Sequence, residues 1–247
     1  MRKIVKDEPD FVAVAGGDGS MTRAAAELAH RRTTLGVLPL GTGNSFAHSL
    51  GIDDLESAVR TLASGEVRKV DLGVVNGRYF ANFSTIGLTS DIAASTPDLL
   101  KRIAGVGAYV LAGIIPALRN HRFAVKIRGN GVRFKGDVHQ VIVASGRHFG
   151  ETPILPSASV LSGQLAVYTA TEDGVPGVAK EFLAVARGKQ TELEDAHWWT
   201  TTRVNVKADP PQLIAIDGKP IEETPARFRI APRALRVLVP RGFDGFP

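Results

Sequence analysis

Two glycine-rich stretches near the start of the chain carry the residues best suited to chemistry. They are Gly16-Gly17-Asp18-Gly19-Ser20 and Gly41-Thr42-Gly43-Asn44. A backbone without Cβ atoms can approach a ligand closely, and free N–H groups at a helix start can hold an anion such as phosphate. Asp18 lies among three glycines, and its carboxylate suits Mg²⁺ bound to nucleotide phosphates. On the residues alone, tight turns between strand and helix remain the alternative.

Each glycine stretch follows a short apolar strand and leads into a helix. Phe11–Ala15 and Leu35–Leu38 lack polar alternation, as expected of parallel strands that are covered on both faces. The residues that follow predict one helix from Met21 to about His30 and a short one through 45–47. Ligands of such sheets bind beyond the carboxyl ends of the strands. We therefore expect both glycine loops to face one site.

Several other kinds of site find no support in the sequence. No Gly-x-x-x-x-Gly-Lys-Ser/Thr motif occurs, and Gly-x-Gly-x-x-Gly is absent from both loops. The six histidines lack metal-binding spacing, and without cysteines the chain can form neither disulfides nor a Cys-based zinc site. The absence of cysteines suits a cytoplasmic protein.

The composition is that of an ordinary globular protein with a mildly basic surface. The 247 residues are 44% hydrophobic and 22% charged, enough for one large domain or two small ones. The net charge is +5, but the basic residues are dispersed, so we expect no nucleic-acid partner. The longest uncharged apolar run, 103–118, is shorter than the roughly 20 residues of a transmembrane helix.

Strand–helix alternation gives way to strands near Leu72, where we place a domain boundary. Before it, Asp53-x-x-Glu56 predicts the capping box of a helix that Gly65 ends. Asn76-Gly77 between two apolar runs predicts a β-hairpin. Short strands with turn signals then favour a β-sandwich. The expected strands are 123–127, 132–135, 138–144, 165–170, 203–207 and 213–216.

Two helical segments are expected among these strands. The apolar region 96–119 either packs in the core or lines an acyl-chain pocket, and core packing is the better-supported reading. A charged helix is expected at 177–187.

The two glycine motifs together resemble those of the diacylglycerol kinase catalytic-domain family, which includes bacterial soluble lipid kinases and sphingosine kinases. The first motif is shared with NAD kinases. The second, Pro39-Leu40-Gly41-Thr42-Gly43-Asn44-Ser45-Phe46-Ala47 followed by Leu50-Gly51-Ile52, favours the lipid kinases. The resemblance covers essentially the whole chain.

The resemblance implies a Rossmann-like, NAD-kinase-like α/β domain followed by a β-sandwich domain. The nucleotide-binding domain would comprise 1–72 and 235–247, because the terminal strand returns to it, and the lipid-substrate domain would comprise 73–234. Members of the family usually have a further strand and helix before the first glycine loop, with an Asn-Pro sequence. Nothing here matches that segment, so the nucleotide domain is expected to be incomplete at its N-terminus.

The resemblance also assigns roles to the residues of the two loops. The glycines and their neighbours Ser20 and Thr42 would shape a phosphate cradle, Asn44 would orient nucleotide or substrate, and Asp18 would act near Mg²⁺. Asp71, which on its own could be a plain strand-end aspartate, would join Asp18 in a hydrated network. Ser45 stands where the family has this network's third aspartate.

Near the end of the chain, the resemblance implies a catalytic base. Asp217-Gly218 follows an apolar strand and could be a simple turn, but in lipid kinases the matching aspartate takes the proton from the lipid hydroxyl. Lys219 replaces the glutamate that usually follows. Ser162 and Ala166 replace two carboxylates that help to hold a structural Mg²⁺ in the family, so we expect this second metal site to be absent.

These observations predict an ATP- and Mg²⁺-dependent kinase that phosphorylates diacylglycerol or a similar lipid. It would act in the cytoplasm, peripherally at a membrane surface, and a homodimer is compatible with the sequence. Two alternatives stay open. One is a kinase of the NAD kinase type, and the other is a non-catalytic relative that binds lipid or nucleotide.

Overall fold

The computed structural model describes residues 8–87, 122–149, 152–153, 158–171, 180, 184 and 196–245. The predicted helical region 96–119 lies outside the described residues, as does all of the predicted helix 177–187 except residues 180 and 184.

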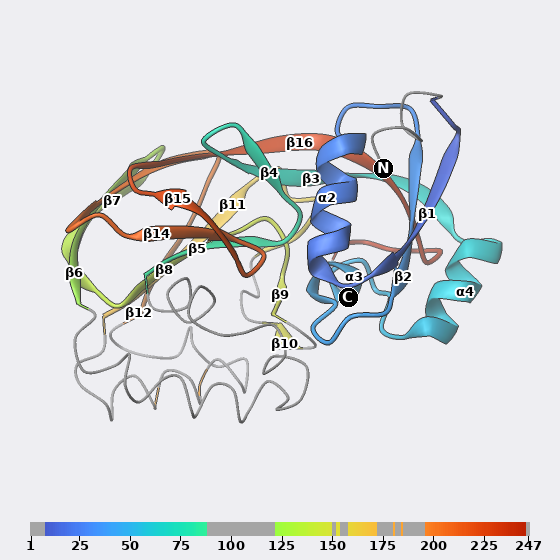
Figure 1. Ribbon diagram of the computed structural model, residues 1–247, viewed down its shortest axis with the longest axis horizontal. Helices are drawn as coiled ribbons and strands as arrows, with labels where there is room; N and C mark the ends of the chain where they lie inside the picture. Colours follow the sequence, from blue (N-terminus) through green and yellow to red (C-terminus); the bar gives the residue numbers. More distant parts are fainter. Residues whose placement is uncertain are drawn as a thin grey trace.

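The first part of the chain forms the α/β arrangement that the sequence predicts (Figure 1). Strand β1 (Phe11–Gly16) pairs in parallel with β2 (Thr34–Pro39). Helices α2 (Asp18–Leu28), α3 (Ser45–His48) and α4 (Leu55–Ser64) accompany these strands. Strand β2 is almost wholly buried, whereas β1 alternates between buried and exposed residues. The expectation of cover on both faces is therefore wrong for β1, because the face that carries Phe11, Ala13 and Ala15 is exposed in the described part of the chain.

The start of α4 differs by one residue from the sequence prediction. The N-cap is Asp54, not Asp53: its carboxylate accepts a 2.7 Å hydrogen bond from the Ser57 N–H, and the Asp54 N–H donates to the Ser57 hydroxyl at 3.0 Å. The predicted box from Asp53 to Glu56 is wrong, because a serine and not a glutamate closes it. Helix α2 likewise begins at Asp18, ahead of the predicted Met21, so the first glycine loop is already part of its first turn.

Two long strands connect the α/β part to the rest of the molecule. Strand β3 (Glu66–Val75) and strand β16 (Ala226–Val239) are antiparallel neighbours and run side by side across Figure 1. Val237 of β16 pairs with Leu35 of β2 in parallel, which confirms that the terminal strand returns to the first domain. The boundaries expected after residues 72 and 234 both fall inside these strands.

Strands dominate the remainder of the described chain. The first sheet has the order β1-β2-β16-β13-β6-β7; β3 also pairs with β16, and β4 pairs with β3. Its further strands are β4 (Arg78–Phe80), β6 (Phe123–Gly129), β7 (Val132–Val138) and β13 (Arg203–Asp209). The predicted hairpin joins β3 to β4, with Asn76 and Gly77 at φ values of 46° and 84°.

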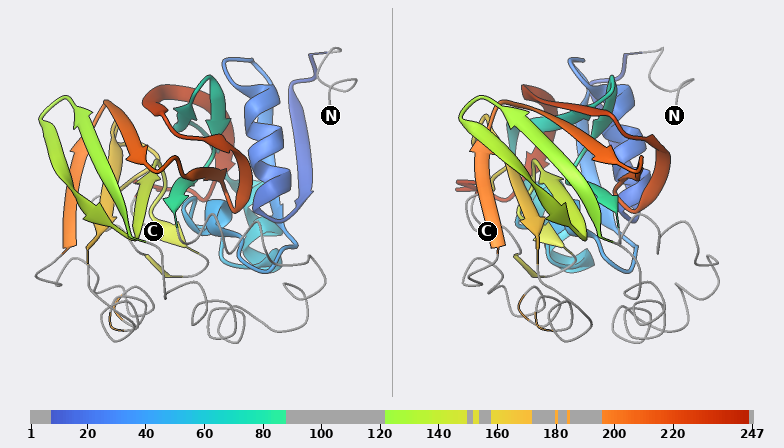
Figure 2. Two further views of the ribbon diagram at one scale, coloured as in Figure 1. Left: turned by 60° about the vertical axis from the view of Figure 1, so that its left-hand side comes forward. Right: turned by 90° about the vertical axis from the view of Figure 1, so that its left-hand side faces the viewer.

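A second sheet faces the far end of the first one (Figure 2). Its order is β12-β11-β8-β5-β14-β15. These strands are β5 (Phe83–Gly87), β8 (Gln140–Ala144), β11 (Leu165–Ala170), β12 (Ala196–Thr201), β14 (Leu213–Ile216) and β15 (Lys219–Glu223). Strands β9 (His148–Phe149) and β10 (Thr152–Pro153) form a separate ribbon.

One apolar core fills the space between the two sheets. It includes Ile127, Val204 and Phe228 from the first sheet and Val143 and Leu165 from the second, all of them buried. Burial of this kind from two facing sheets is the defining feature of a sandwich. The fold is therefore an α/β domain with a β-sandwich, as the sequence predicts.

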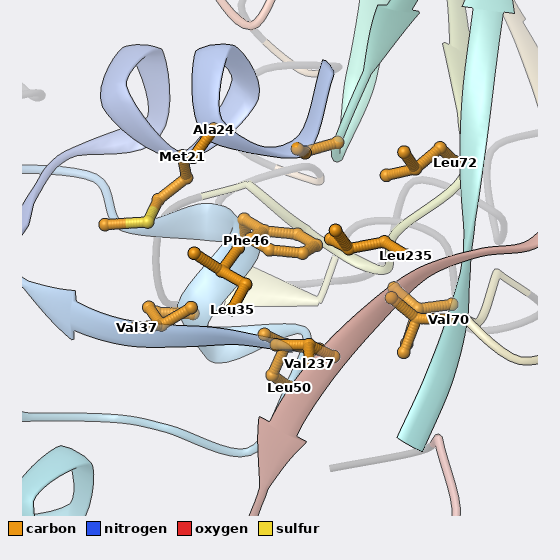
Figure 3. Close-up of a cluster of buried hydrophobic side chains, with 14 of the residues drawn as sticks. Met21, Ala24, Leu35, Val37, Phe46, Leu50, Val70, Leu72, Leu235 and Val237 are labelled. Carbon is orange, nitrogen blue, oxygen red and sulfur yellow. The ribbon is translucent and has the colours of Figure 1, made fainter. Parts of the chain in front are cut away.

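A separate core lies beneath the two glycine loops (Figure 3). Phe46 of α3 is only 1% exposed and lies among side chains from α2, β2, β3 and β16. Because Phe46 comes two residues after the second glycine loop, its burial anchors that loop to the sheet. The side chains around it include Met21, Leu35, Leu72, Leu235 and Val237.

Candidate active site

The two glycine loops lie against each other at the carboxyl ends of β1 and β2. A Cβ atom added to Gly41 would lie 2.4 Å from the Gly17 Cα atom, and one added to Gly17 would lie 3.0 Å from the Gly41 Cα atom. Contacts this short leave no room for a side chain at Gly41, so the sequence needs glycine there. The loops therefore form one surface, as the sequence predicts.

Asn44 shapes the second loop from within. Its side-chain oxygen accepts a 2.8 Å hydrogen bond from the Gly41 N–H, and its amide donates to the Gly41 carbonyl at 2.9 Å. Asn44 itself adopts a left-handed conformation, with φ of 50°, which asparagine tolerates better than most residues. These bonds hold the loop in a closed turn, with Gly41 and Thr42 exposed at its tip. The role in orienting nucleotide or substrate that the resemblance implies stays a prediction.

Asp18 joins the first loop to the second. One carboxylate oxygen accepts a 3.0 Å hydrogen bond from the Phe46 N–H, and the other lies 3.4 Å from the Ser45 hydroxyl. Ser45 thus contacts Asp18 although it is not the aspartate that the family usually has there. The Asp18 side chain is only partly buried, so its oxygens keep lone pairs on the open side of the loops. The binding of Mg²⁺ by Asp18 that the resemblance implies stays a prediction.

Asp217 reaches the same region from the β-sandwich. It lies in the tight turn between β14 and β15, where Asp217 and Gly218 have φ values of 43° and 76°. The hydroxyl of Thr22, on α2, donates a 2.5 Å hydrogen bond to one carboxylate oxygen of Asp217. Since Thr22 follows Asp18 by one helical turn on the same face, this bond brings the two aspartates to one site.

Backbone donors complete the surroundings of Asp217. The Phe83 N–H donates to one carboxylate oxygen at 3.0 Å, and the Ala81 N–H donates to the other at 3.3 Å. Burial raises the pKa of Asp217 to about 6, although the hydrogen bonds from Phe83, Thr22 and Ala81 oppose this rise; the negative charge of Asp18 adds to it. A carboxylate with such a pKa can accept a proton near neutral pH and give it up again.

Asp71 is bound by backbone N–H groups from two other segments of the chain. Its buried carboxylate accepts hydrogen bonds from the Gly163 N–H at 2.6 Å and from the Arg233 N–H at 2.7 Å. Arg233 is left-handed, with φ of 52°, and lies where the pairing of β16 with β3 shifts register. In the described part of the chain, no hydrogen bond or ion pair links Asp71 to Asp18. Its contacts therefore stabilise a strand irregularity, and the hydrated network stays a prediction.

Lys219 completes the group of charged residues. It is the exposed first residue of β15, directly after the Asp217-Gly218 turn. Its Nζ atom lies 3.0 Å from the position that a Cβ atom on Gly19 would occupy. The ammonium group therefore lies over the first turn of α2.

Sequence reasoning missed Thr22 and the two N–H donors to Asp217. The spacing of Thr22, four residues after Asp18, could have identified it, because residues at that interval share one helix face. The N–H groups of Ala81 and Phe83 leave no mark in the sequence, because every residue except proline carries one.

The segment expected to lack a structural metal site holds together through its own polar groups. The Ser162 hydroxyl donates to the Ser159 carbonyl at 2.9 Å, while Gly163 binds Asp71. Among the described residues, no three histidine, aspartate or glutamate side chains gather as a metal site would require.

None of the helices described is both long and apolar enough to cross a membrane.

Comparisons with known proteins agree with this geometry. Residues 1–75 match the model of the diacylglycerol kinase catalytic domain, and residues 88–239 match that of the YegS C-terminal NAD kinase beta sandwich-like domain. A protein of Pseudomonas aeruginosa strain UCBPP-PA14, named "Probable lipid kinase YegS-like", is 32% identical over 237 residues, which are 94% of this chain and 77% of that protein. A diacylglycerol kinase of Bacillus subtilis strain 168 is 29% identical over 241 residues, 95% of this chain and 79% of that enzyme.

The fold also resembles that of a solved structure. The crystal structure of a diacylglycerol kinase from Bacillus anthracis strain Sterne superposes with a TM-score of 0.76 at 23% identity, covering 94% of this chain and 78% of that one. A sequence identity of 23% shows only that the two proteins share a fold. Membership of the family is shown by the two domain matches and by the Pseudomonas relative. The chain therefore belongs to the family of diacylglycerol kinases and YegS-like lipid kinases.

Proposed function

We propose that this protein transfers the γ-phosphate of ATP to a hydroxyl group of diacylglycerol or a similar lipid. The observation that carries the proposal is the hydrogen bond between Thr22 and Asp217. It brings a carboxylate of the β-sandwich to the helix that carries Asp18 and the first glycine loop. A base for the acceptor and a site for the nucleotide phosphates then share one face of α2.

The glycine loops would hold the nucleotide. At the start of α2 the N–H groups of Asp18 and Gly19 have no backbone partner among the described residues, and the helix dipole favours a negative charge there. Asp18 would hold Mg²⁺ together with phosphate oxygens and water molecules. When bound, the cation would neutralise charge on the phosphates. The contact between Gly17 and Gly41 keeps the two loops at a fixed spacing for this ligand.

Asp217 would orient the lipid hydroxyl and accept its proton. In phosphoryl transfer the bond to the leaving group is largely broken before the new O–P bond is well formed, so placing the attacking oxygen matters more than early removal of its proton. The pKa of about 6 leaves Asp217 mostly ionised at neutral pH and able to accept a hydrogen bond from the hydroxyl.

The lipid acceptor is inferred from the relatives' names. Both relatives described above are named for phosphorylating lipids, one of them diacylglycerol. Since diacylglycerol resides in membranes, the protein would act in the cytoplasm, peripherally at a membrane surface.

The test is transfer of labelled γ-phosphate from Mg·ATP to diacylglycerol in mixed micelles, with NAD offered in a parallel reaction. We expect label in the lipid and none in NAD. Label in NAD alone would show that the protein is a kinase of the NAD kinase type. Nucleotide binding without transfer to either acceptor, by a chain shown to be folded, would overturn the proposal in favour of a non-catalytic relative.

A further inference from the structure

Lys219 places a positive charge beside the amino end of α2, where a bound anion would be favourable. Its Nζ atom lies 3.0 Å and its Cε atom 3.1 Å from the position of a Cβ atom on Gly19, the second residue of α2. The amino end of a helix carries a partial positive charge, so an ammonium group there is repelled. The first turn of α2 carries one acidic residue, Asp18, whose negative charge offsets only part of this repulsion.

No carboxylate in the described part of the chain neutralises Lys219. Asp18 and Asp217 are the acidic groups of this region, yet no ion pair within 4.0 Å joins either of them to the lysine among the described residues. Each carboxylate is instead satisfied by hydroxyl and N–H donors. The three donors of the ammonium group therefore remain available to a ligand.

Two independent sets of donors thus converge on one position. In the first turn of α2 the N–H groups of Ser20 and Met21 donate to the Gly17 carbonyl. The N–H groups of Asp18 and Gly19 have no backbone partner among the described residues, and the Lys219 ammonium lies over the same turn. An anion between them would satisfy both and would turn the repulsion into attraction. Of the phosphates of a bound nucleotide, the one that reacts must lie nearest the base, and only Gly218 separates Lys219 from Asp217 in the chain.

We propose that Lys219 binds an oxygen of the γ-phosphate and stabilises the charge that develops on it during transfer. This inference rests on the proposed kinase function. In the step, the lipid oxygen forms a bond to the γ-phosphorus while the bond to the β-phosphate oxygen breaks. The hydroxyl proton passes to Asp217, ADP leaves, and Lys219 stays protonated throughout. A fixed cation at such a position stabilises the transferred group without any covalent chemistry.

The resemblance makes this role specific to chains with a lysine here. The resemblance implies a glutamate at this position, and a carboxylate there would repel a phosphate oxygen. The β14–β15 turn therefore presents a different charge to the same loop.

Nucleotide binding, measured without lipid by isothermal titration calorimetry, separates this role from others. The probes are Mg²⁺ with a non-hydrolysable ATP analogue and Mg²⁺ with ADP, each titrated into the full chain. Lys219→Met keeps most of the apolar stem but removes the charge, and Lys219→Arg keeps the charge. Lys207→Met, at an exposed position on β13, is the matched control.

We expect Lys219→Met to weaken binding of the ATP analogue about ten- to hundredfold, as the loss of a charged hydrogen bond should. Binding of ADP should stay unchanged, Lys219→Arg should restore most of the lost affinity, and the control should match the original chain. The inference would be overturned if Lys219→Met lowered the affinity for both nucleotides equally or for neither. It would also be overturned if the original chain did not bind the ATP analogue more tightly than ADP.

The lipid assay keeps this outcome apart from the fate of the proposed function. If the Lys219-dependent preference for the analogue is present but no lipid is labelled, Lys219 keeps its role and the lipid acceptor is wrong. If lipid is labelled and Lys219→Met leaves both analogue binding and turnover unchanged, the kinase stands and the role of Lys219 falls.

Discussion

The raised pKa of Asp217 makes the stability of the folded chain depend on pH in a specific direction. Burial raises this pKa from 3.8 to about 6. Between these values the folded chain keeps a proton that the unfolded chain has already released. The contribution of Asp217 to stability is therefore full below about pH 4 and declines as the pH rises through 6.

The size of the effect follows from the shift. About two pKa units at 1.36 kcal/mol each correspond to roughly 3 kcal/mol of folding free energy, lost between about pH 4 and pH 7. Asp217→Asn cannot titrate, so the variant lacks this loss. The asparagine also changes the hydrogen bonds with Thr22 and the two N–H groups, but that change is the same at every pH. The slope against pH, not the stability at one pH, is the diagnostic quantity.

Urea unfolding followed by circular dichroism, at several pH values across this window, measures the slope. The original chain and Asp217→Asn should differ in their pH dependence by roughly 3 kcal/mol, with the variant gaining relative to the original chain as the pH rises. Asp10→Asn, an exposed carboxylate without a side-chain hydrogen bond in the described part of the structure, should follow the original chain. Parallel curves for the original chain and Asp217→Asn would refute the reasoning.

Three further predictions concern the loops, the ribbon and the core. Gly41→Ala places a Cβ atom 2.4 Å from the Gly17 Cα atom, so the loops should separate and calorimetry should show at least about tenfold weaker nucleotide binding. His148 is buried, and its burial, with help from His48, lowers its pKa from 6.5 to about 4. The contribution of His148 to stability is therefore full above about pH 6.5 and is lost as the pH falls toward 4. In urea unfolding, His148→Phe should make the free energy of unfolding fall less steeply at acid pH. The same acid dependence in the variant and the original chain would contradict this. Phe46→Ala empties the centre of the core under the loops and should cost about 3–5 kcal/mol in urea unfolding, and a loss below about 1 kcal/mol would show that the side chain is not anchored there.

The fold was most predictable where the chemistry of one or two residues dictates the backbone. Asn76-Gly77 adopts the left-handed pair that a tight hairpin requires, and these are the residues that tolerate it best. The cap of α4 was less predictable, because Asp53 and Asp54 are adjacent and each has a polar residue three positions later. Only the geometry of the loop decides that Ser57 meets Asp54.

The candidate site was predictable in its parts but not in its assembly. The glycine loops could be identified from their residues alone, and their contact follows because they end two adjacent parallel strands. The hydrogen bond between Thr22 and Asp217 joins residues 195 positions apart in the sequence, and no local sequence pattern predicts a contact between such distant residues. Asp71 illustrates the converse, because its partner Arg233 depends on a register shift of β16 that the sequence does not reveal.

The central claim is that Asp217 serves as the base of a lipid kinase built on the two glycine loops. The most direct test is the turnover of Asp217→Asn with diacylglycerol in mixed micelles at saturating Mg·ATP, together with its KM for ATP. We predict that kcat falls at least about a hundredfold while the KM for ATP stays close to that of the original chain. Phosphorylated lipid formed at the same rate by both chains would contradict it.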